Sequence, residues 1–127
     1  MKKQYDDNNV FAKILREEIP CKKVYENEYA LSFEDINPQA PVHVLVIPKG
    51  KYLSVTDFSK NASDIEIAGL IKAIGETSEK LGLNGDGYRI LSNAGTNANQ
   101  EVPHLHFHIF GGENVGKMVS SLSLIHI

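Results

Sequence analysis

Three histidines recur at every second position late in the chain. His104, His106 and His108 alternate with apolar residues over 104–109. Successive side chains of a β-strand point to opposite faces and rise about 3.3 Å per residue, so the pattern predicts a strand with three imidazoles about 6.5 Å apart on one face. An ordinary amphipathic strand carries Thr, Ser, Lys or Arg on its wet face, because these side chains do not titrate near neutral pH. The histidine face therefore indicates a functional site.

Two chemistries could use such a face. Imidazole is a common metal ligand, and two histidines separated by one residue on a strand can bind the same zinc ion. Imidazole is also a nucleophile and a proton carrier near neutral pH, so a row of imidazoles could attack phosphorus and deliver a proton to the leaving group. The three histidines alone do not decide between a metal site and phosphorus chemistry.

The size and charge of the chain narrow the class of protein. Its 127 residues are the length of one domain with its own core. The formal net charge is −3 and no basic run exceeds two residues, which gives no electrostatic surface for nucleic acid or for an anionic membrane. We therefore expect no nucleic-acid or membrane partner, whereas a small phosphate ligand is compatible with this charge.

The cysteine count and the start of the chain bear on the compartment. Cys21 is the single cysteine, so no intrachain disulfide can form. Residues 1–9 are polar and acidic, without the apolar centre of a signal peptide, and no stretch approaches the roughly 20 apolar residues that a membrane span needs. We expect a reducing, cytoplasmic location.

Two helices are predicted from apolar residues at helical spacing. The first covers 10–19 and is ended by Pro20. The second opens with a Ser-x-x-Glu capping box at 63–66 and ends at Gly82, a residue that suits the position after a helix C-terminus. Its buried stripe is expected to contain Ile67, Ile71, Ile74 and Leu81.

Five strands are predicted around these helices. Their expected ranges are 22–26, 29–35, 42–48, 88–93 and 104–112. Strands that follow one another directly favour an antiparallel sheet with the helices on one face, an α+β fold. The third strand is apolar on both faces, so it should be central, with His43 half-buried in it. The apolar face of the last strand should meet the second helix, which leaves the histidine face open to a cleft or a partner.

The pattern His-φ-His-φ-His-φ-φ, where φ is apolar, is the signature of the histidine triad (HIT) family, and residues 104–110 match it. Three further segments occur in the family's order. Residues 11–20 resemble its opening helix, 35–49 the ribose-contacting and first-histidine segment of its Hint branch, and 87–93 its penultimate strand. Because four segments agree, the resemblance is specific, and it implies a HIT-like fold.

The resemblance extends over about residues 9–113, which we expect to be the core of a single domain spanning 1–127, with 114–127 as a tail. It implies a hydrolase that cleaves a phosphoramidate or related bond at the α-phosphate of a purine nucleoside monophosphate. His106 matches the nucleophile that forms a transient nucleotidyl-histidine.

The family's remaining site residues can be placed one by one. The other histidines, His43, His104 and His108, match residues that orient the nucleophile, contact the phosphate and relay protons. Asp35 matches the carboxylate on the ribose hydroxyls. The implied phosphate cradle is Asn93 with the loop residues Asn99, Gln100, Glu101 and Val102. The implied purine slot is Phe11, Ile14, Phe33, Ile36 and Leu45, for which ordinary core packing is the alternative interpretation.

Two loop residues depart from the family's pattern. Asn99 stands where the branch usually carries Gly, and Asn tolerates a left-handed backbone better than most residues do. Glu101 stands where some members carry Ser or Thr, and its carboxylate is compatible with a bound phosphate only if it points away or is paired. The tail after Gly112 lacks the tryptophan-containing end of some relatives.

The residues and the resemblance together favour phosphorus chemistry over a metal site. A tetrahedral zinc ion with Zn–N near ~2.1 Å holds its nitrogens about 3.4 Å apart, whereas the three imidazoles are expected about 6.5 Å apart. We therefore expect no metal and no other cofactor. A non-catalytic nucleotide- or partner-binding module and a dinucleoside polyphosphate hydrolase are the alternatives. The complete set of four histidines favours an enzyme, because a binding module needs no nucleophile.

A homodimer is also predicted. In the family resembled, two subunits pair across the second helix and the penultimate strand and join two sheets into one of ten strands. This assigns residues 65–83 and 87–93 to the interface. The second helix carries apolar residues beyond a single stripe, as expected for a helix buried on two sides. The alternative is a monomer whose helix is rich in isoleucine.

Overall fold

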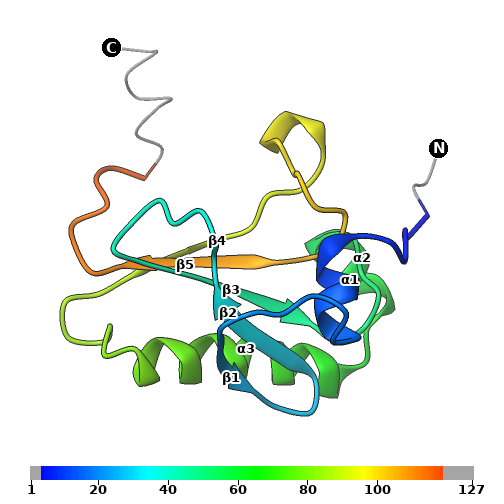
Figure 1. The fold of residues 1–127 in the computed structure, drawn as a ribbon, viewed down its shortest axis with the longest axis horizontal. Coiled ribbons are helices and arrows are strands. Elements are labelled where there is room, and N and C mark those ends of the chain that lie inside the picture. Colours follow the sequence, from blue (N-terminus) through cyan, green and yellow to red (C-terminus); the bar gives the residue numbers. More distant parts are fainter. Residues whose placement is uncertain (1–3, 119–127) are drawn as a thin grey trace.

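The computed structural model describes residues 4–118, so residues 119–127 of the predicted tail lie outside the described residues. The elements in chain order are α1 (Val10–Leu15), β1 (Lys23–Glu26), β2 (Ala30–Glu34), β3 (Val42–Pro48), α2 (Val55–Asn61), α3 (Asp64–Lys80), β4 (Arg89–Leu91), the 3₁₀ helix η1 (Thr96–Ala98) and β5 (Phe107–Gly111). Figure 1 shows one sheet with α3 running along one side of it and α1 on the other. In the described part of the chain, no helix is long and apolar enough to cross a membrane.

Within residues 4–118, five strands form one antiparallel sheet in the order β1-β2-β3-β5-β4. This confirms the predicted five-stranded α+β fold. β3 lies at the centre of the sheet, as its apolar pattern predicts. Its partner β5 places Leu45 opposite His108 and His43 opposite Phe110. Residues directly opposite one another in an antiparallel pair share a face, so the β3–β5 register brings His43 and His108 to the same side of the sheet.

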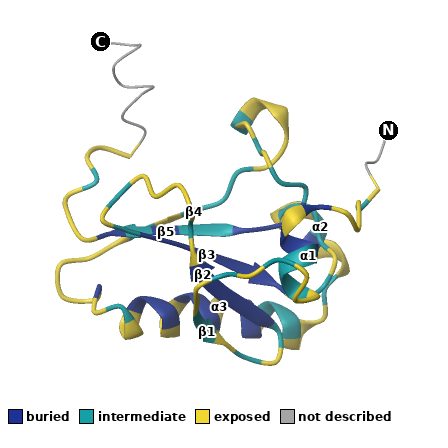
Figure 2. Cartoon of the chain, in the orientation of Figure 1, coloured by how far each residue is buried: buried dark blue, intermediate teal, exposed yellow. Residues whose placement is uncertain are grey.

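The sheet is covered on both faces. Figure 2 shows that the side of α3 facing the sheet is buried and that its outer side is exposed. The core on this face contains Ala30, Val44, Val46, Phe58, Leu70, Ala73, Ile74, Leu83, Leu105 and Ile109. On the opposite face, Phe11 of α1 packs with Leu31, Phe33, Leu45 and Ile47. The expectation that both predicted helices lie on one face is therefore wrong for α1, because β2 and β3 are apolar on both sides and each side needs cover.

α3 has the ends that its sequence predicts. Ser63 caps its first turn, and the reciprocal bonds between Ser63 and Glu66 complete the capping box. Gly82 follows the C-cap with a φ of 73°, a left-handed conformation that glycine adopts without strain. The predicted buried stripe is wrong at Ile71, which is 57% exposed, whereas Leu70 is buried. The observed buried residues Leu70, Ala73, Ile74 and Thr77 also follow helical spacing, and Ile74 is the residue that they share with the predicted stripe.

Other elements differ from their predicted ranges. α1 ends at Leu15 rather than near residue 19, because Glu17 takes a left-handed backbone with a φ of 63°. α2 is not predicted from the sequence, because Phe58 is its one buried residue and the segment shows no apolar stripe. β4 covers Arg89–Leu91 rather than 88–93. None of these differences changes the strand order that builds the site.

Candidate active site

The histidine segment enters the sheet later than its alternation predicts. β5 begins at Phe107, so His104 and His106 precede the strand on irregular backbone. Val46 of β3 is the last residue paired with β5, opposite Phe107. β3 then ends at Pro48, which has no backbone N–H to continue the ladder. The prediction of one strand starting at His104 is therefore wrong at its beginning.

A cleft of about 740 Å³ opens beside α1, β3 and the loops before β3 and β5. The sequence-predicted residues that line it are Phe11, Ile14, Phe33, Asp35, Ile36, His43, Leu45, Asn93, Asn99, Glu101, Val102, His106 and His108. His104 and Gln100 are described by the structure but lie outside this lining. The fold therefore gathers residues from five separate segments of the chain around two of the three triad histidines.

His106 presents one ring nitrogen to this cleft in an unprotonated form. Its Nδ1 lies 2.7 Å from the backbone carbonyl oxygen of His104. A carbonyl oxygen only accepts, so we assign the proton of the neutral ring to Nδ1 and the lone pair to Nε2. Burial lowers the pKa of His106, with the His104 carbonyl acting against it. His106 is therefore neutral at pH 7 and has the lone pair that a nucleophile requires.

His104 lies behind His106 and is sealed from solvent, with 0% exposure. Its Nε2 lies 2.9 Å from the Pro48 carbonyl oxygen, and its Nδ1 lies 2.5 Å from the Tyr5 hydroxyl. By the same rule Nε2 carries the proton and Nδ1 accepts from Tyr5. Burial lowers the pKa of His104 to about 4. Both nitrogens are thus occupied, so His104 supports the site without facing the cleft.

His43 and His108 form a second chain of hydrogen bonds along the cleft. The backbone N–H of Gln39 donates to His43 Nδ1 over 3.0 Å, so the proton of His43 is on Nε2. His43 Nε2 lies 2.9 Å from His108 Nδ1 and donates to it. His108 then carries its own proton on Nε2. Burial lowers the pKa of His43, and it lowers the pKa of His108 to about 4, with His106 and His43 acting in the same direction.

Asp35 joins this chain at the edge of the cleft. Its Oδ2 lies 3.3 Å from His43 Nε2, and its Oδ1 accepts the backbone N–H of Asn37 over 2.8 Å. The ligand atoms of Asp35, His43 and His108 all lie within 4.8 Å of one another. Two imidazoles and a carboxylate are a donor set that also suits a transition metal ion. In the described structure His43 and His108 are hydrogen-bonded to each other, with the Asp35 carboxylate beside them, which favours proton transfer as their use.

The loop before β5 contains the residues expected to cradle phosphate. Asn99 has a φ of 56°, so it adopts the left-handed backbone predicted for it. Gln100 braces the loop: its side chain accepts the N–H of Gly95 and donates to the carbonyls of Leu53 and Val102. Glu101 is exposed on the cleft and has no ion pair within residues 4–118. An anionic ligand would therefore meet this carboxylate unless its side chain turns outward.

The apolar wall of the cleft is also part of the core. Phe11, Phe33 and Leu45 are buried, and the rings of Phe11 and His106 meet edge to face with centroids 4.9 Å apart. Core packing and cleft lining are thus two roles of the same side chains. Ile36 differs, because it is 93% exposed at the rim of the cleft and is no part of the core.

Sequence reasoning missed several residues of the site. Gln39 orients His43 through its backbone, a contact four positions apart that its proline-containing loop could have indicated. Tyr5 and Pro48 hold His104 from 99 and 56 positions away, and no local pattern marks such contacts. The cleft is also lined by Val10, Ile19, Pro20, Cys21, Glu34 and Asn37, which flank the segments predicted to form the site.

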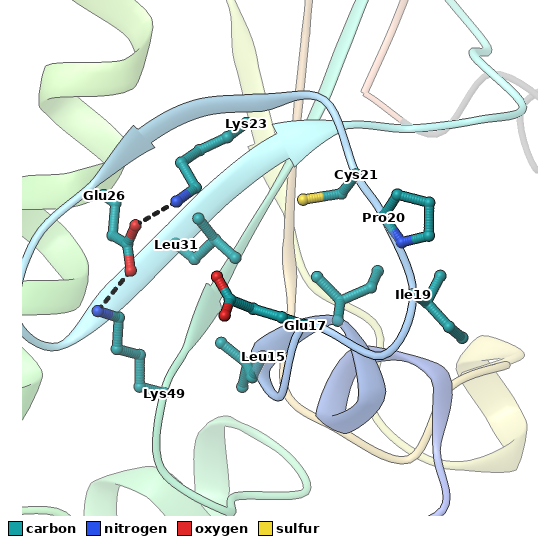
Figure 3. Close-up of a pocket in the computed structure, with 10 residues that line it drawn as sticks. Leu15, Glu17, Ile19, Pro20, Cys21, Lys23, Glu26, Leu31 and Lys49 are labelled. Atoms are coloured by element: carbon teal, nitrogen blue, oxygen red, sulfur yellow. Dashed lines mark hydrogen bonds and ion pairs between the residues drawn. The ribbon is translucent and has the colours of Figure 1, made fainter.

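A second cavity of about 500 Å³ adjoins the cleft and shares with it residues of the segment 14–21. Figure 3 shows Glu26 in this cavity between Lys23 and Lys49, at 2.6 and 2.7 Å. These charges pair with one another, and none of the described residues that line the cavity is a histidine. The candidate active site is therefore the cleft that contains His106 rather than this cavity.

Comparisons with known proteins agree with this geometry. The model of the HIT domain matches residues 16–115. A 13.2 kDa HIT-like protein of Azospirillum brasilense is 62% identical over 120 residues, which are 94% of this chain and 98% of that protein. The purine nucleoside phosphoramidase of Escherichia coli K12 is 36% identical, with 93% of this chain and 98% of that protein covered. A HIT family hydrolase from Legionella pneumophila Philadelphia 1 superposes with a TM-score of 0.79 at 36% identity, covering 86% of this chain and 96% of the other.

The similarity extends over nearly the whole length of these relatives and includes the segments that form the cleft. A phosphoramidase relative and a solved structure called a hydrolase support hydrolase chemistry in general. Sequence motif, sheet topology and domain model all agree, and the chain belongs to the HIT family.

Proposed function

We propose that this chain cleaves a phosphoramidate or related bond at the α-phosphate of a purine nucleoside monophosphate, through a nucleotidyl intermediate on His106. The single observation that carries the proposal is the hydrogen bond from His106 Nδ1 to the His104 carbonyl oxygen, 2.7 Å long. It places the lone pair on Nε2, in a ring that lines the cleft. A neutral, oriented imidazole at the centre of the cleft is what attack on phosphorus requires.

His108 is the proposed proton donor to the leaving group. The substrate phosphate is an anion, and an anion beside His108 favours its imidazolium form in the complex. In that form His108 Nδ1 also carries a proton, so the hydrogen bond from His43 Nε2 to His108 Nδ1 is given up when substrate binds. His106 Nε2 forms a bond to phosphorus, the P–N bond breaks, and the nitrogen takes the proton of His108 Nε2 and leaves as an amine. Water then attacks phosphorus, returns a proton to His108, and releases the nucleoside monophosphate from His106.

The rest of the cleft supports binding of the nucleoside. We assign Asp35 to the ribose hydroxyls, because its carboxylate lines the cleft next to the histidine chain. We assign the purine to the apolar wall, for which Phe11, Phe33 and Leu45 supply large surfaces. The phosphate is assigned to Asn93 and to the loop 99–102, whose shape the Gln100 side chain maintains. His104 and Gln100 take supporting rather than contacting roles in this proposal.

A homodimer is the proposed assembly, with each chain contributing a single domain of core 9–113. The support is a set of exposed apolar side chains on α3 and on or next to β4, an edge strand of the sheet: Ile65, Ile71, Tyr88 and Ile90. Large apolar groups that remain exposed in a monomer commonly mark an interface. Ile71→Glu should lower the mass in solution without unfolding the chain. A wild-type mass near 14 kDa by light scattering would exclude the dimer.

The proposal extends to metal ions, other partners and location. The cleft is proposed to work without a metal ion, so treatment with a chelator should leave the rate unchanged, and a loss restored only by zinc would contradict this. The proposed partners exclude nucleic acid and membranes, in line with the net charge of −3. A cytoplasmic location is inferred from the single cysteine.

The test of the function is a comparison of substrates on the purified chain. An adenosine phosphoramidate, its guanosine counterpart and a diadenosine polyphosphate are assayed for release of the nucleoside monophosphate. We expect turnover of the phosphoramidates to exceed turnover of the polyphosphate. Preference for the polyphosphate would favour the dinucleoside polyphosphate hydrolase. Binding of all three ligands without turnover would favour the non-catalytic binding module.

A further inference from the structure

Tyr5 makes a contact with the histidine row that neither the motif nor the cleft accounts for. It lies in the segment before α1, and its hydroxyl is 2.5 Å from Nδ1 of His104. The two rings meet edge to face, with centroids 5.5 Å apart. Nδ1 of His104 belongs to a fully buried side chain, and within residues 4–118 the Tyr5 hydroxyl is its hydrogen-bond partner.

We propose that Tyr5 is a positioning residue for the reaction at His106, acting through His104. The inference rests on the proposed function of His106 as the nucleophile. It adds a residue outside both the histidine motif and the cleft lining to the machinery of the site.

Two hydrogen bonds connect Tyr5 to the nucleophile through His104, and a third fixes the His104 ring. The Tyr5 hydroxyl donates to His104 Nδ1, and His104 Nε2 donates to the Pro48 carbonyl at 2.9 Å, so the ring is held at both nitrogens. The carbonyl of the same residue accepts the Nδ1 proton of His106 at 2.7 Å. A shift of His104 therefore moves its backbone carbonyl oxygen, the acceptor that sets both the orientation and the tautomer of the His106 ring.

The segment that carries Tyr5 is fastened at several points, so the contact is part of the fold. The side chain of Asn9 caps α1 at Ala12 and also donates to the carbonyl of Asp6 over 2.7 Å. Lys51 pairs with the Asp7 carboxylate at 2.8 Å, and Arg16 donates to the Asp7 carbonyl at 2.9 Å. These contacts hold residues 6–9 against the domain and bring Tyr5 over His104.

The hydroxyl is in the protonation state that the contact requires. Burial raises the pKa of Tyr5, with Asp7 acting in the same direction. The phenol therefore keeps its proton at neutral pH and can only donate to Nδ1, since Nδ1 of His104 has no proton of its own to give. The hydrogen bond therefore has one direction, from the Tyr5 hydroxyl to His104 Nδ1.

The test is Tyr5→Phe, which keeps the aromatic ring and removes only the hydroxyl. We expect kcat for an adenosine phosphoramidate to fall about 3- to 10-fold, because a buried acceptor loses its donor, while KM changes less than about twofold. By NMR, the His104 Nδ1 resonance should shift, and the His106 Nδ1 proton should exchange faster with solvent. The matched control is Tyr25→Phe on β1, a tyrosine that packs on the α3 side of the sheet, and it should change none of these quantities.

A purely structural role for Tyr5 would lower the melting temperature but leave kcat and the His106 proton unchanged well below it, and that result would overturn the proposal. Tyr5→Phe in a His104→Gln background should cause no further loss in kcat, whereas an equal loss in both backgrounds would show that Tyr5 does not act through His104. If the wild-type chain cleaves no phosphoramidate, the proposed function fails instead. The exchange rate of the His106 proton then still decides whether Tyr5 positions that ring.

Discussion

The two faces of the sheet are built on different principles. On the α3 face, apolar side chains such as Leu70 and Val46 pack in a core in which the buried hydroxyls bond one another or the backbone. On the α1 face, His43, His104 and His106 are buried as well, and each is fixed by named hydrogen bonds. The first face stabilises the fold. The second holds neutral imidazoles in assigned tautomers at the expense of stability, since burial disfavours their charged forms.

Removing the nucleophile should have the largest effect and should be confined to the α1 face. His106→Ala is expected to lower phosphoramidate turnover by at least about 10³-fold, because the group that bonds to phosphorus is gone. Nucleotide affinity should stay within about tenfold, and circular dichroism should show an intact fold. Steady-state kinetics and calorimetric titration with AMP measure the two quantities. Equal turnover by mutant and wild type would contradict the assignment.

A core substitution on the α3 face should do the opposite. Leu70→Ala removes a buried side chain and is expected to lower the free energy of unfolding by about 2–5 kcal/mol, measured by urea denaturation. At temperatures where the chain remains folded, kcat should change by less than about twofold. A large loss of kcat without a loss of stability would mean that the two faces are not separable.

The stability of the α1 face should depend on pH. The pKa of His104 is about 4 in the folded chain and about 6.5 when unfolded. The unfolded state therefore binds more protons between these values, and stability falls as pH decreases through this window and levels off below it. For His104 the loss between pH 7 and pH 5 should be about 2 kcal/mol. Urea titrations at the two pH values measure it, and stability that rises toward pH 5 would contradict the assigned neutral rings.

A smaller effect is expected at the edge of the cleft. Asp35→Asn should weaken ribonucleotide binding by about 1–2 kcal/mol, because a charged hydrogen bond to a hydroxyl is replaced by a neutral one. The loss for 2′-deoxy analogues should be smaller. Calorimetric titration with ribonucleotides and with their 2′-deoxy analogues separates the outcomes. Identical losses of affinity for the two would mean that Asp35 does not bind the ribose hydroxyls.

The α3 face was largely predictable because its signals are local. The capping box at Ser63 and Glu66, the left-handed Gly82 and the apolar β3 each leave a pattern within a few residues. The exposure of Ile71, which was expected to be buried, shows the limit of this reasoning. Both Leu70 and Ile71 are apolar, and only the packing of α3 on the sheet decides which one is buried.

The α1 face was predictable in composition but not in geometry. The motif identified the histidines, but their alternation placed all three on one open face. The end of β3 at Pro48 and the distant contact with Tyr5 place His104 behind the cleft instead. The tautomers of His43 and His106 depend on backbone groups of Gln39 and His104, which have no signature in side-chain chemistry.

The central claim is that His106 bonds to phosphorus, and mass spectrometry of the chain quenched during turnover tests it most directly. The wild-type protein is mixed with an adenosine phosphoramidate, quenched within the first turnovers, digested under conditions that preserve phosphohistidine, and mapped by fragmentation. We expect an adenylyl group on the peptide that contains residues 104–110, located on His106. An adduct on another residue, or turnover without any adduct in a rapidly quenched series, would contradict the account.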